Sequence, residues 1–353
     1  MRSAITFPRE DSDANGPQNR PTMRDVAALA GVGVATVSRV IRGESTVSEG
    51  LRAKVLHAAV QLDYLPNLTA SSLRRSTRQT STIGLLLGNV ANPFSSGLHR
   101  AIGDVAAARG FDVFSGSLDE NAEAEHRLAA KFAARRVDGL IIVPASHDHS
   151  YLATQRHVGM AMVFVDRPAE LLDADAVLVD NRGGMATATR HLLSFGHTRI
   201  GYLGDLGSIW TAQQRFTGYC QTLVSTGFSC DPSLVRNDVR GVDAAEAATA
   251  ELLALPDPPT AILASQNVLT IGAIRVLRRL GLHHRIAIVG FDDFLLADLV
   301  EPAITVVAQD ARQMGTLAAE ILFARLDGDR SPTSRREVET RFLIRGSGEI
   351  RPD

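Results

Sequence analysis

Charged and amide side chains stand at the ends of several short apolar runs in this sequence of 353 residues. Asp166 ends "MAMVFVD", Asp292 ends "IAIVGFD", and Gln266 and Asn267 end "AILASQN". If these runs are parallel strands, the polar side chains meet at the carboxyl ends, where such sheets bind ligands. A carboxylate accepts hydrogen bonds from two neighbouring hydroxyls, and a guanidinium such as that of Arg215 donates two. These side chains are therefore candidates for contacts with a small-molecule ligand.

Aromatic residues near the same strand ends extend this interpretation. Asn92 and Phe94 follow the run "TIGLLLG", and Trp210, the single tryptophan, follows "IGYLGD". An aromatic face can pack on the apolar side of a sugar ring. For Trp210, exposure to solvent or packing between two parts of the protein is as good an interpretation as stacking on a ligand. Asp166 is alternatively a cap for the turn that follows it, and Arg215 an ordinary helix charge.

No set of residues in the sequence indicates catalysis. Asp292 and Asp293 are adjacent carboxylates, but neighbours at one strand end point in different directions, and no nucleophile stands with a base. His191 and His197 fit structural roles, and for His197 a hydrogen bond to the backbone is expected. Neither a Gly-x-Gly-x-x-Gly after a strand nor a phosphate-binding glycine loop is present. We therefore expect no enzyme activity, no catalytic residue and no cofactor.

The two cysteines and the apolar runs exclude further classes. Cys220 and Cys230 have no zinc-site spacing, so the sequence predicts neither a metal site nor a disulfide framework. The longest apolar runs have strand length and fall short of the roughly 20 residues that a membrane helix needs. Residues 1–20 lack the apolar core of a signal peptide and predict a disordered tail. These observations indicate a cytoplasmic protein with no membrane partner.

Charge is distributed unevenly along the chain. Residues 21–80 carry eight arginines and lysines against four acids, although the whole chain has a formal net charge of −2. A basic first module on an acidic body favours a polyanionic partner for that module. A merely solvated basic surface is the alternative.

The segment "PTMRDVAALAGVGVATVSRVIRG" predicts two short helices joined by a tight turn. Thr22 followed by Asp25 is a capping signal for the first helix, and Gly31 tolerates the positive φ that ends it. The second helix is expected at about Val34–Ile41, with Val37 turned inward. This helix-turn-helix layout places its second helix in the major groove of DNA. A generic helical hairpin is the alternative.

A third helix is expected after Ser48, which would cap it. Apolar residues at helical spacing then close a three-helix core: Leu51, Val55, Leu56, Ala59 and Leu62. Pro66 interrupts any helix, and Asn67 caps a restart, "NLTASSL", that is too short and polar to be stable alone. That segment is a candidate switch, because it forms only when something supports it.

From Ile83 onward, apolar strands alternate with helical segments. This βαβ rhythm predicts parallel sheets covered by helices. The remaining length accommodates two such units.

The combination "RDVAALAGV…ATVSRV" with "YLPNLTASSL" resembles the LacI/GalR family of bacterial transcription regulators, and the resemblance extends from about residue 22 to 347. It implies a recognition helix that turns Val34, Ala35 and Arg39 toward base edges. The guanidinium of Arg39 has the fork geometry that reads guanine. The phosphate contacts implied by the resemblance come from Thr22, Thr36, Ser38, Ser48 and Asn67.

The same resemblance implies a hinge helix at Asn67–Arg74. Its Ala70 and Leu73 would lie in the minor groove, with Leu73 as the wedge that opens a base step. It also implies effector contacts at Phe94, Asp166, Arg215, Gln266 and Asp292. Here "QN" at 266–267 replaces the family's common "ND" pair.

The resemblance implies an α/β architecture: an N-terminal helix-turn-helix headpiece and a two-lobed effector domain of the periplasmic-binding-protein type I, with Rossmann-like parallel sheets. The expected domains are a tail (1–20), the headpiece (21–66), a hinge helix and linker (67–80), and an effector-binding and dimerisation domain (81–353). Within the last, the first lobe spans 81–179 with part of 308–330. The second spans 180–307 with the tail.

We expect a sequence-specific DNA-binding transcriptional regulator, in particular a repressor. It would read a palindromic operator in double-stranded DNA as a homodimer, and respond to a sugar or sugar derivative. A tetramer is the alternative assembly, and a nucleoside or purine the alternative effector. A solute-binding receptor for transport would use the same lobes, but the headpiece argues against it.

Overall fold

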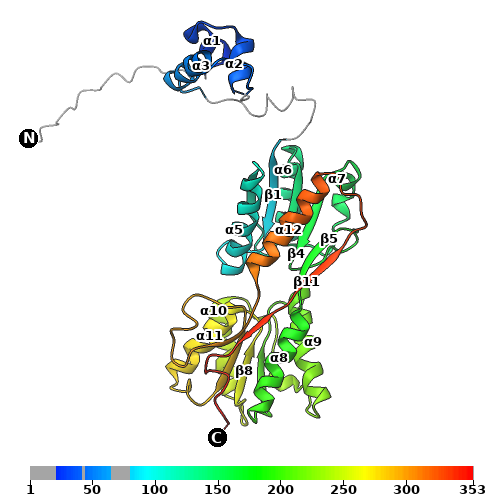
Figure 1. Cartoon of the computed structure of the whole chain (residues 1–353). Helices are drawn as coiled ribbons and strands as arrows, with labels where there is room; N and C mark the ends of the chain where they lie inside the picture. Colours follow the sequence, from blue (N-terminus) through cyan, green and yellow to red (C-terminus); the bar gives the residue numbers. More distant parts are fainter. Residues whose placement is uncertain (1–20, 42–43, 65–79, 353) are drawn as a thin grey trace, which may run out of the picture. The chain divides into compact units, whose positions relative to one another are not determined.

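A computed structural model describes residues 21–41, 44–64 and 80–352 of the chain (Figure 1). The chain divides into two compact units, residues 1–78 and 79–353. The expected hinge helix, with Asn67, Ala70 and Leu73, lies outside the described residues.

The described part of the N-terminal unit contains three helices: α1 (Met23–Ala30), α2 (Val34–Ile41) and α3 (Glu49–Gln61). At the start of α1, the Asp25 carboxylate accepts hydrogen bonds from the backbone N–H and the hydroxyl of Thr22, both at 2.7 Å. The helix ends at Gly31, whose φ of 65° is left-handed. Both the capping signal and the glycine turn predicted from the sequence are therefore confirmed.

A small apolar core joins the three helices. Its fully buried members include Val26 of α1, Val37 of α2 and Val55 of α3. The prediction that Leu51 and Leu56 close this core is wrong, because their side chains are 39% and 50% exposed. Leu56 lies about 100° around the helix from Val55, and Leu51 lies in the first turn of α3.

Ser48 precedes α3 at the N-cap position, as expected, but its side chain makes no capping hydrogen bond. The helix is therefore held by its packing against α1 and α2 rather than by a side-chain cap.

The C-terminal unit is built on two sheets. The strands of the first are β1 (Thr82–Leu87), β2 (Asp112–Ser117), β3 (Gly139–Ile142), β4 (Ala161–Val165), β5 (Asp175–Val179) and β11 (Arg335–Val338). Those of the second are β6 (Ile200–Leu203), β7 (Val235–Arg236), β8 (Ala261–Ala264), β9 (Ala287–Phe291), β10 (Thr305–Ala308) and β12 (Arg341–Leu343). The strand orders are equivalent, β11-β5-β4-β3-β1-β2 and β12-β10-β9-β8-β6-β7. The strands of each sheet pair in parallel, except that β12 is antiparallel to β10.

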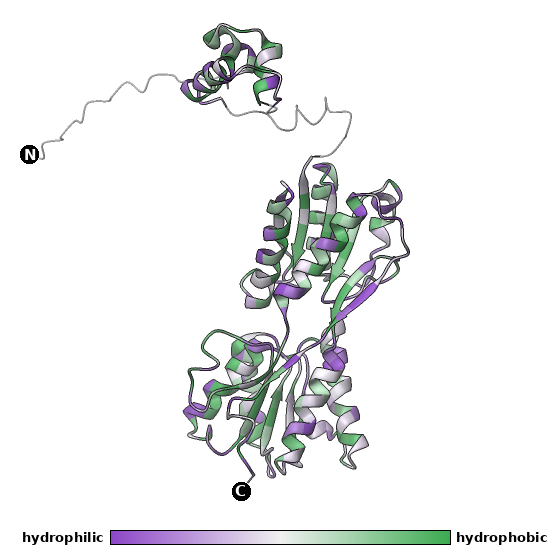
Figure 2. Ribbon diagram, viewed as in Figure 1, coloured by the Kyte–Doolittle hydropathy of each residue, from purple (hydrophilic) through white to green (hydrophobic). Residues whose placement is uncertain are grey.

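Helices cover both faces of each sheet, which buries the central strands (Figure 2). On the first sheet these are α5 (Pro93–Ala108), α6 (Ala122–Ala134), a short α7 (Ala153–His157) and α12 (Ala311–Leu326). On the second they are α8 (Asn181–Ser194), α9 (Trp210–Ser225), α10 (Gly241–Leu253) and α11 (Asn267–Arg279). Two further turns are 3₁₀-helical, at Ser150–Leu152 and Pro232–Leu234. Each lobe thus has two apolar layers, one on either side of its sheet.

The chain crosses between the lobes three times, after β5, after β10 and after β11. The sequence interpretation gave the tail beyond residue 330 to the second lobe, and for β11 this is wrong. β11 pairs in parallel with β5 at the edge of the first sheet (Figure 1). Of its four residues, Arg-Arg-Glu-Val, only Val338 is buried. The sequence therefore has no apolar run that predicts a strand there.

Cys220 and Cys230 form a disulfide bond, so the prediction of no disulfide is wrong. Cys220 lies on α9, and Cys230 lies on the connection that leads from α9 back to the sheet. This reversal of the chain brings together two cysteines whose spacing matches no motif.

Among the described residues, no helix is long and apolar enough to span a membrane.

Candidate functional site

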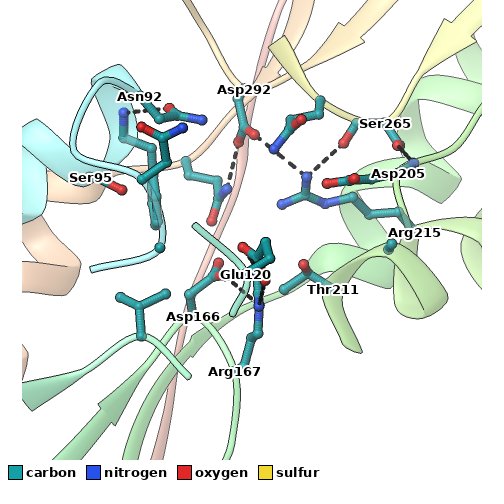
Figure 3. Close-up of a pocket in the computed structure, with 17 residues that line it drawn as sticks. Asn92, Ser95, Glu120, Asp166, Arg167, Asp205, Thr211, Arg215, Ser265 and Asp292 are labelled. Carbon is teal, nitrogen blue, oxygen red and sulfur yellow. Dashed lines mark hydrogen bonds and ion pairs between the residues drawn. The ribbon is translucent and has the colours of Figure 1, made fainter. Parts of the chain in front are cut away.

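A cavity of about 580 Å³, open to solvent, lies between the two lobes at the carboxyl ends of their strands. Figure 3 shows its charged side chains converging from both lobes. The charged residues in its wall are Glu120, Asp166, Arg167, Asp205, Arg215 and Asp292. Amides and hydroxyls complete the lining, among them Asn92, Ser95, Thr211, Gln266 and Gln309.

Most of the residues singled out in the sequence meet in this cavity. Those that line it are Phe94, Asp166, Arg215, Gln266, Asp292 and Asn92. Trp210 does not line it and belongs to a smaller neighbouring cavity. Asn267 is also outside the wall, but its amide nitrogen donates to Asn92 Oδ1 at 3.3 Å. That bond joins α11 of the second lobe to the start of α5 in the first.

Arg215, in the second turn of α9, is held firmly by its neighbours. Its Nε donates to Asn181 Oδ1 at 2.7 Å, and its Nη1 donates to the Ser265 carbonyl at 2.6 Å. The guanidinium lies 3.8 Å from the ring centroid of Phe291, a cation–π contact. Nη1 is also 3.5 Å from Asp292 Oδ2. Nη2 makes no hydrogen bond to any described residue, which leaves two donors for a ligand.

Asp292 is bound from the opposite direction by Gln309, which lies on the second crossing between the lobes. The Gln309 amide nitrogen donates to Asp292 Oδ1 at 2.5 Å. The Gln309 amide oxygen is buried and finds no partner among the described residues. Because a buried acceptor without a donor is costly, Gln309 is a candidate acceptor for a ligand hydroxyl. It follows β10 directly, so the strand-end rule could have identified it.

Arg167 and Glu120 form an ion pair at the floor of the cavity that the sequence interpretation missed. Two nitrogens of Arg167 donate to the two Glu120 oxygens at 2.5 and 2.8 Å, and one also donates to the Pro144 carbonyl at 2.8 Å. Burial alone would lower the pKa of Arg167, but the hydrogen bond and charge of Glu120 raise it above its usual value. Arg167 therefore stays charged. No apolar run ends at Glu120, so no sequence signal pointed to this pair.

Burial acts on the pKa of two acids of the cavity, Asp166 and Asp205. Burial, the largest influence, raises the pKa of Asp166, and the charges of Arg167 and Arg215 offset it only in part. Burial also raises the pKa of Asp205, and its hydrogen bond from the Leu206 backbone N–H offsets this only in part. Asp205 ends "IGYLGD" and obeys the same strand-end rule as Asp166 and Asp292, so it too could have been found.

The balance of charge decides what the cavity can bind. Four carboxylates face two guanidiniums, so a ligand with its own negative charge would be repelled. Neutral hydroxyl groups can donate to the carboxylates and accept from Arg215, which satisfies both kinds of charged group. The arrangement therefore suits a neutral, hydroxyl-rich molecule.

The neighbouring carboxylate and the histidines have structural roles. Asp293 turns away from the cavity and pairs with Arg345, with two N···O distances of 2.7 Å. His197 is buried between the Thr260 hydroxyl and the Ile350 carbonyl, at 2.9 and 2.7 Å. His191 contacts the Glu349 carboxylate at 2.5 Å. Within the described residues, no group of His, Cys, Asp and Glu is arranged to hold a metal ion.

A second candidate surface lies on α2 of the N-terminal unit. Val37 and Val40 are buried in the small core, which turns the opposite face of the helix outward. Val34, Ala35 and Arg39 are exposed on that face. Thr36 and Ser38 are half-buried beside them, and Thr22 and Ser48 are exposed at the starts of α1 and α3. The helix thus presents small apolar groups and one guanidinium, a set suited to base edges in a major groove.

Comparisons with known proteins identify the domains on which the two surfaces lie. Residues 22–67 match the bacterial regulatory proteins of the lacI family, and residues 189–348 match a periplasmic binding protein-like domain. The regulator CelR of Thermobifida fusca is 33% identical over 94% of this chain and 99% of its own length. A solved CelR–cellobiose complex covers 93% of this chain and 100% of its own, with 32% identity and a TM-score of 0.69. The lac repressor dimer bound to operator and an anti-inducer covers 94% and 99%, with 25% identity and a TM-score of 0.79.

Proposed function

This chain belongs to the LacI family of bacterial regulatory proteins and is a DNA-binding transcriptional regulator, and on that premise we propose that it is a repressor controlled by a neutral sugar. In this proposal two copies bind a palindromic operator, and the sugar binds in the cavity between the lobes. The observation that carries the proposal is the meeting of Asp166, Arg215 and Asp292 in one cavity.

The proposed DNA contacts lie on the outward face of α2. Arg39 is exposed at its C-terminal half, where its two-pronged guanidinium suits the O6 and N7 atoms of guanine. Val34 and Ala35 offer apolar contact to a thymine methyl. Thr22, Thr36, Ser38 and Ser48 are proposed to contact phosphates, which position the helix without reading sequence. Asn67, Ala70 and Leu73 complete the predicted DNA contacts from outside the described residues.

A homodimer is proposed because one short recognition helix reads too few base pairs for operator specificity. The solved lac repressor is a dimer bound to operator, which supports the same assembly here. A palindromic site would then place one half-site under each headpiece.

The proposed effector contacts divide between the lobes. Phe94 and Asp166 come from the first lobe, and Arg215, Gln266 and Asp292 come from the second. A sugar bound to both sets stabilises their closed arrangement, because it interacts fully only when the lobes are together. The cellobiose bound to CelR supports a sugar as the ligand class.

Among the residues that the structure describes, two direct hydrogen bonds join the lobes without a ligand. One joins Asn267 to Asn92 at 3.3 Å. In the other, Arg240 of the second lobe donates to the Asp119 carbonyl of the first at 2.7 Å. If effector binding changes how far the lobes close, it also changes the conformation of the unit to which the headpiece is attached. The coupling between sugar and operator is a free energy shared by both sites, so each ligand must alter the affinity for the other.

The test is a footprint of the purified protein on the DNA upstream of its own gene, titrated with neutral sugars. A two-fold symmetric footprint released by one sugar is the expected result. If the sugar instead strengthens the footprint, the chain is still a sugar-responsive regulator. The proposal that sugar relieves repression would then be wrong. A footprint unaffected by sugars but altered by a nucleoside would overturn the effector class alone.

A further inference from the structure

A second cavity of about 400 Å³ opens beside the first and shares two of its residues, Glu120 and Arg167. Its remaining wall comes from two loops of the first lobe, 144–147 and 168–170, and from residues 206–210 of the second. The Arg167–Glu120 pair, which Figure 3 shows in the first cavity, therefore stands at the junction of the two cavities. One molecule long enough to occupy both would pass this pair.

The second cavity differs from the first in chemistry. Its wall is mixed: the apolar side chains of Pro144, Pro168, Leu206, Ile209 and Trp210 stand beside charged and polar ones such as Arg167 and His147. Hydroxyl and carboxylate groups are fewer, and they include Ser146 and Glu170. An aromatic side chain among hydrogen-bonding groups suits a pyranose ring, whose C–H face packs on an aromatic face while its edge remains polar.

Trp210 is fixed at this wall before any ligand arrives. It lies at the first residue of α9 and packs against the apolar layer of the first lobe that contains Leu152 and Met162. It therefore reaches across from the second lobe and remains half-buried. A rigid aromatic surface at a lobe boundary loses little conformational freedom when a ligand stacks on it.

The facing loop is also held in place. The fully buried Glu125 carboxylate accepts hydrogen bonds from the backbone N–H groups of Ala145 and Ser146 at 2.5 and 2.9 Å. The Tyr151 hydroxyl donates to the other oxygen of Glu125 at 2.7 Å. This loop and Trp210 thus form two prepared sides of one slot, which is the arrangement expected of a binding subsite.

From these observations we infer that the effector is a disaccharide rather than a monosaccharide. One ring occupies the charged cavity, the glycosidic linkage passes the Arg167–Glu120 pair, and the second ring lies against Trp210. The inference rests on the proposed sugar effector and specifies its size. A single ring would leave the second cavity and the face of Trp210 unused.

The test compares monosaccharides with the disaccharides that contain them: glucose with cellobiose and maltose, and galactose with lactose. Affinities of the full-length protein are measured by calorimetry, and the only tryptophan in the chain reports contact with the second ring by fluorescence. At least one disaccharide is expected to bind on the order of tenfold more tightly than its monosaccharide, which is about 1.4 kcal/mol, and to change the tryptophan emission.

Substitutions at two positions distinguish loss of the binding subsite from a general loss of stability. Trp210→Phe keeps an aromatic face and should retain part of the preference, whereas Trp210→Ala should lose it. Since Trp210→Ala also removes a contact between lobes, Ser208→Tyr is the second variant. Ser208 is exposed at the mouth of the second cavity, so a tyrosine there should obstruct the second ring and leave monosaccharide affinity unchanged.

Monosaccharides that bind as tightly as disaccharides, in the wild type and in Ser208→Tyr, would overturn the inference and leave the sugar effector intact. A protein that binds none of these sugars would overturn the sugar effector itself, and the disaccharide with it. The two failures are therefore distinguishable in one set of titrations.

Discussion

Asp166 and Asp292 occupy equivalent positions in the two lobes and face the same cavity. Each follows the last residue of a buried strand, β4 or β9, and each has left-handed backbone, with φ of 72° and 69°. The backbone N–H of Asp166 donates to Val177 at 2.9 Å, and that of Asp292 donates to Val307 at 2.8 Å. Both side chains are 9% exposed. The repeated lobe architecture thus delivers one carboxylate from each lobe to the cavity.

Replacing the carboxylate of Asp166 by an amide should stabilise the ligand-free protein at neutral pH. Because burial raises the pKa of Asp166 in the folded state, folding favours the protonated form. That contribution is present at low pH and is lost as the pH rises through the raised pKa. Asp166→Asn should raise Tm at pH 7, because the neutral amide avoids the cost of keeping a buried carboxylate ionised. The gain should shrink toward pH 4.

Asp293→Asn is the matched control for that experiment. The hydrogen bond from Arg345 lowers the pKa of Asp293, so its contribution to stability is present above the ordinary pKa and is lost as the pH falls. The variant should lower Tm at pH 7, with the opposite sign to Asp166→Asn. Melting curves between pH 4 and 8 that show the same sign for both variants would contradict the assignment of burial as the cause at Asp166.

Arg215→Lys should abolish most of the effector response and keep operator binding. Lysine retains the charge beside Asp292 but cannot donate to Asn181, to the Ser265 carbonyl and to a ligand together. Loss of a charge-assisted hydrogen bond, about 1.5–3 kcal/mol, should weaken sugar binding roughly 10- to 150-fold. Calorimetry measures the first effect and a gel-shift titration the second. An unchanged sugar affinity would place the effector elsewhere.

Arg240→Ala should weaken effector binding without touching the effector. It removes the hydrogen bond from Arg240 to the Asp119 carbonyl, which joins the lobes. One such bond contributes about 0.5–1.5 kcal/mol, so the apparent affinity should fall about 2- to 10-fold. Arg236→Ala is the control, because Arg236 pairs with Glu251 inside the second lobe. Equal losses in both variants would show that general stability, rather than closure, is responsible.

Arg39→Ala should relax base preference and cost on the order of 1–3 kcal/mol in operator binding. Lys54→Ala removes an equal charge from an exposed site on α3 and serves as the comparison. Its effect should be similar on operator and on random DNA. If Arg39→Ala also weakened both DNAs equally, Arg39 would be a phosphate contact and not a base reader.

Reduction of the disulfide should destabilise the C-terminal unit. The bond closes a loop of sequence separation 10, for which the loop-entropy estimate is about 2–3 kcal/mol. Urea unfolding with and without dithiothreitol measures the difference. The double variant Cys220→Ala, Cys230→Ala should unfold at the same urea concentration in both conditions. A wild type equally insensitive to reductant would mean that the cysteines are unpaired in solution.

The cavity residues that could be predicted from the sequence are those marked by their immediate neighbours along the chain. Strand-end positions identified Asp166, Gln266 and Asp292 because each directly follows an apolar run. Asp205 and Gln309 also follow strands, and the structure places both in the cavity wall. Arg167 and Glu120 lie 47 residues apart and follow no shared pattern, so their pairing depends on the packing of the first lobe.

Burial was harder to predict than secondary structure. The three headpiece helices follow from capping and glycine signals, yet Leu51 and Leu56 are exposed because a short helix buries only the stripe that meets its neighbours. β11 escaped detection because an edge strand does not need an apolar run. Trp210 is close to Arg215 along the chain, but the structure places it in the second cavity rather than in the charged one. Closeness in sequence does not decide which cavity a side chain enters.

The three crossings between the lobes have a mechanical consequence. A single connecting segment would let one lobe swivel freely about it, whereas three segments that leave from β5, β10 and β11 oppose twisting and sliding. The permitted movement is then close to one bending coordinate, along which the cavity opens or shuts. A ligand that fixed the value of this single coordinate would send the same displacement to the far end of the first lobe each time. The response is therefore reproducible from one molecule to the next, as a switch requires.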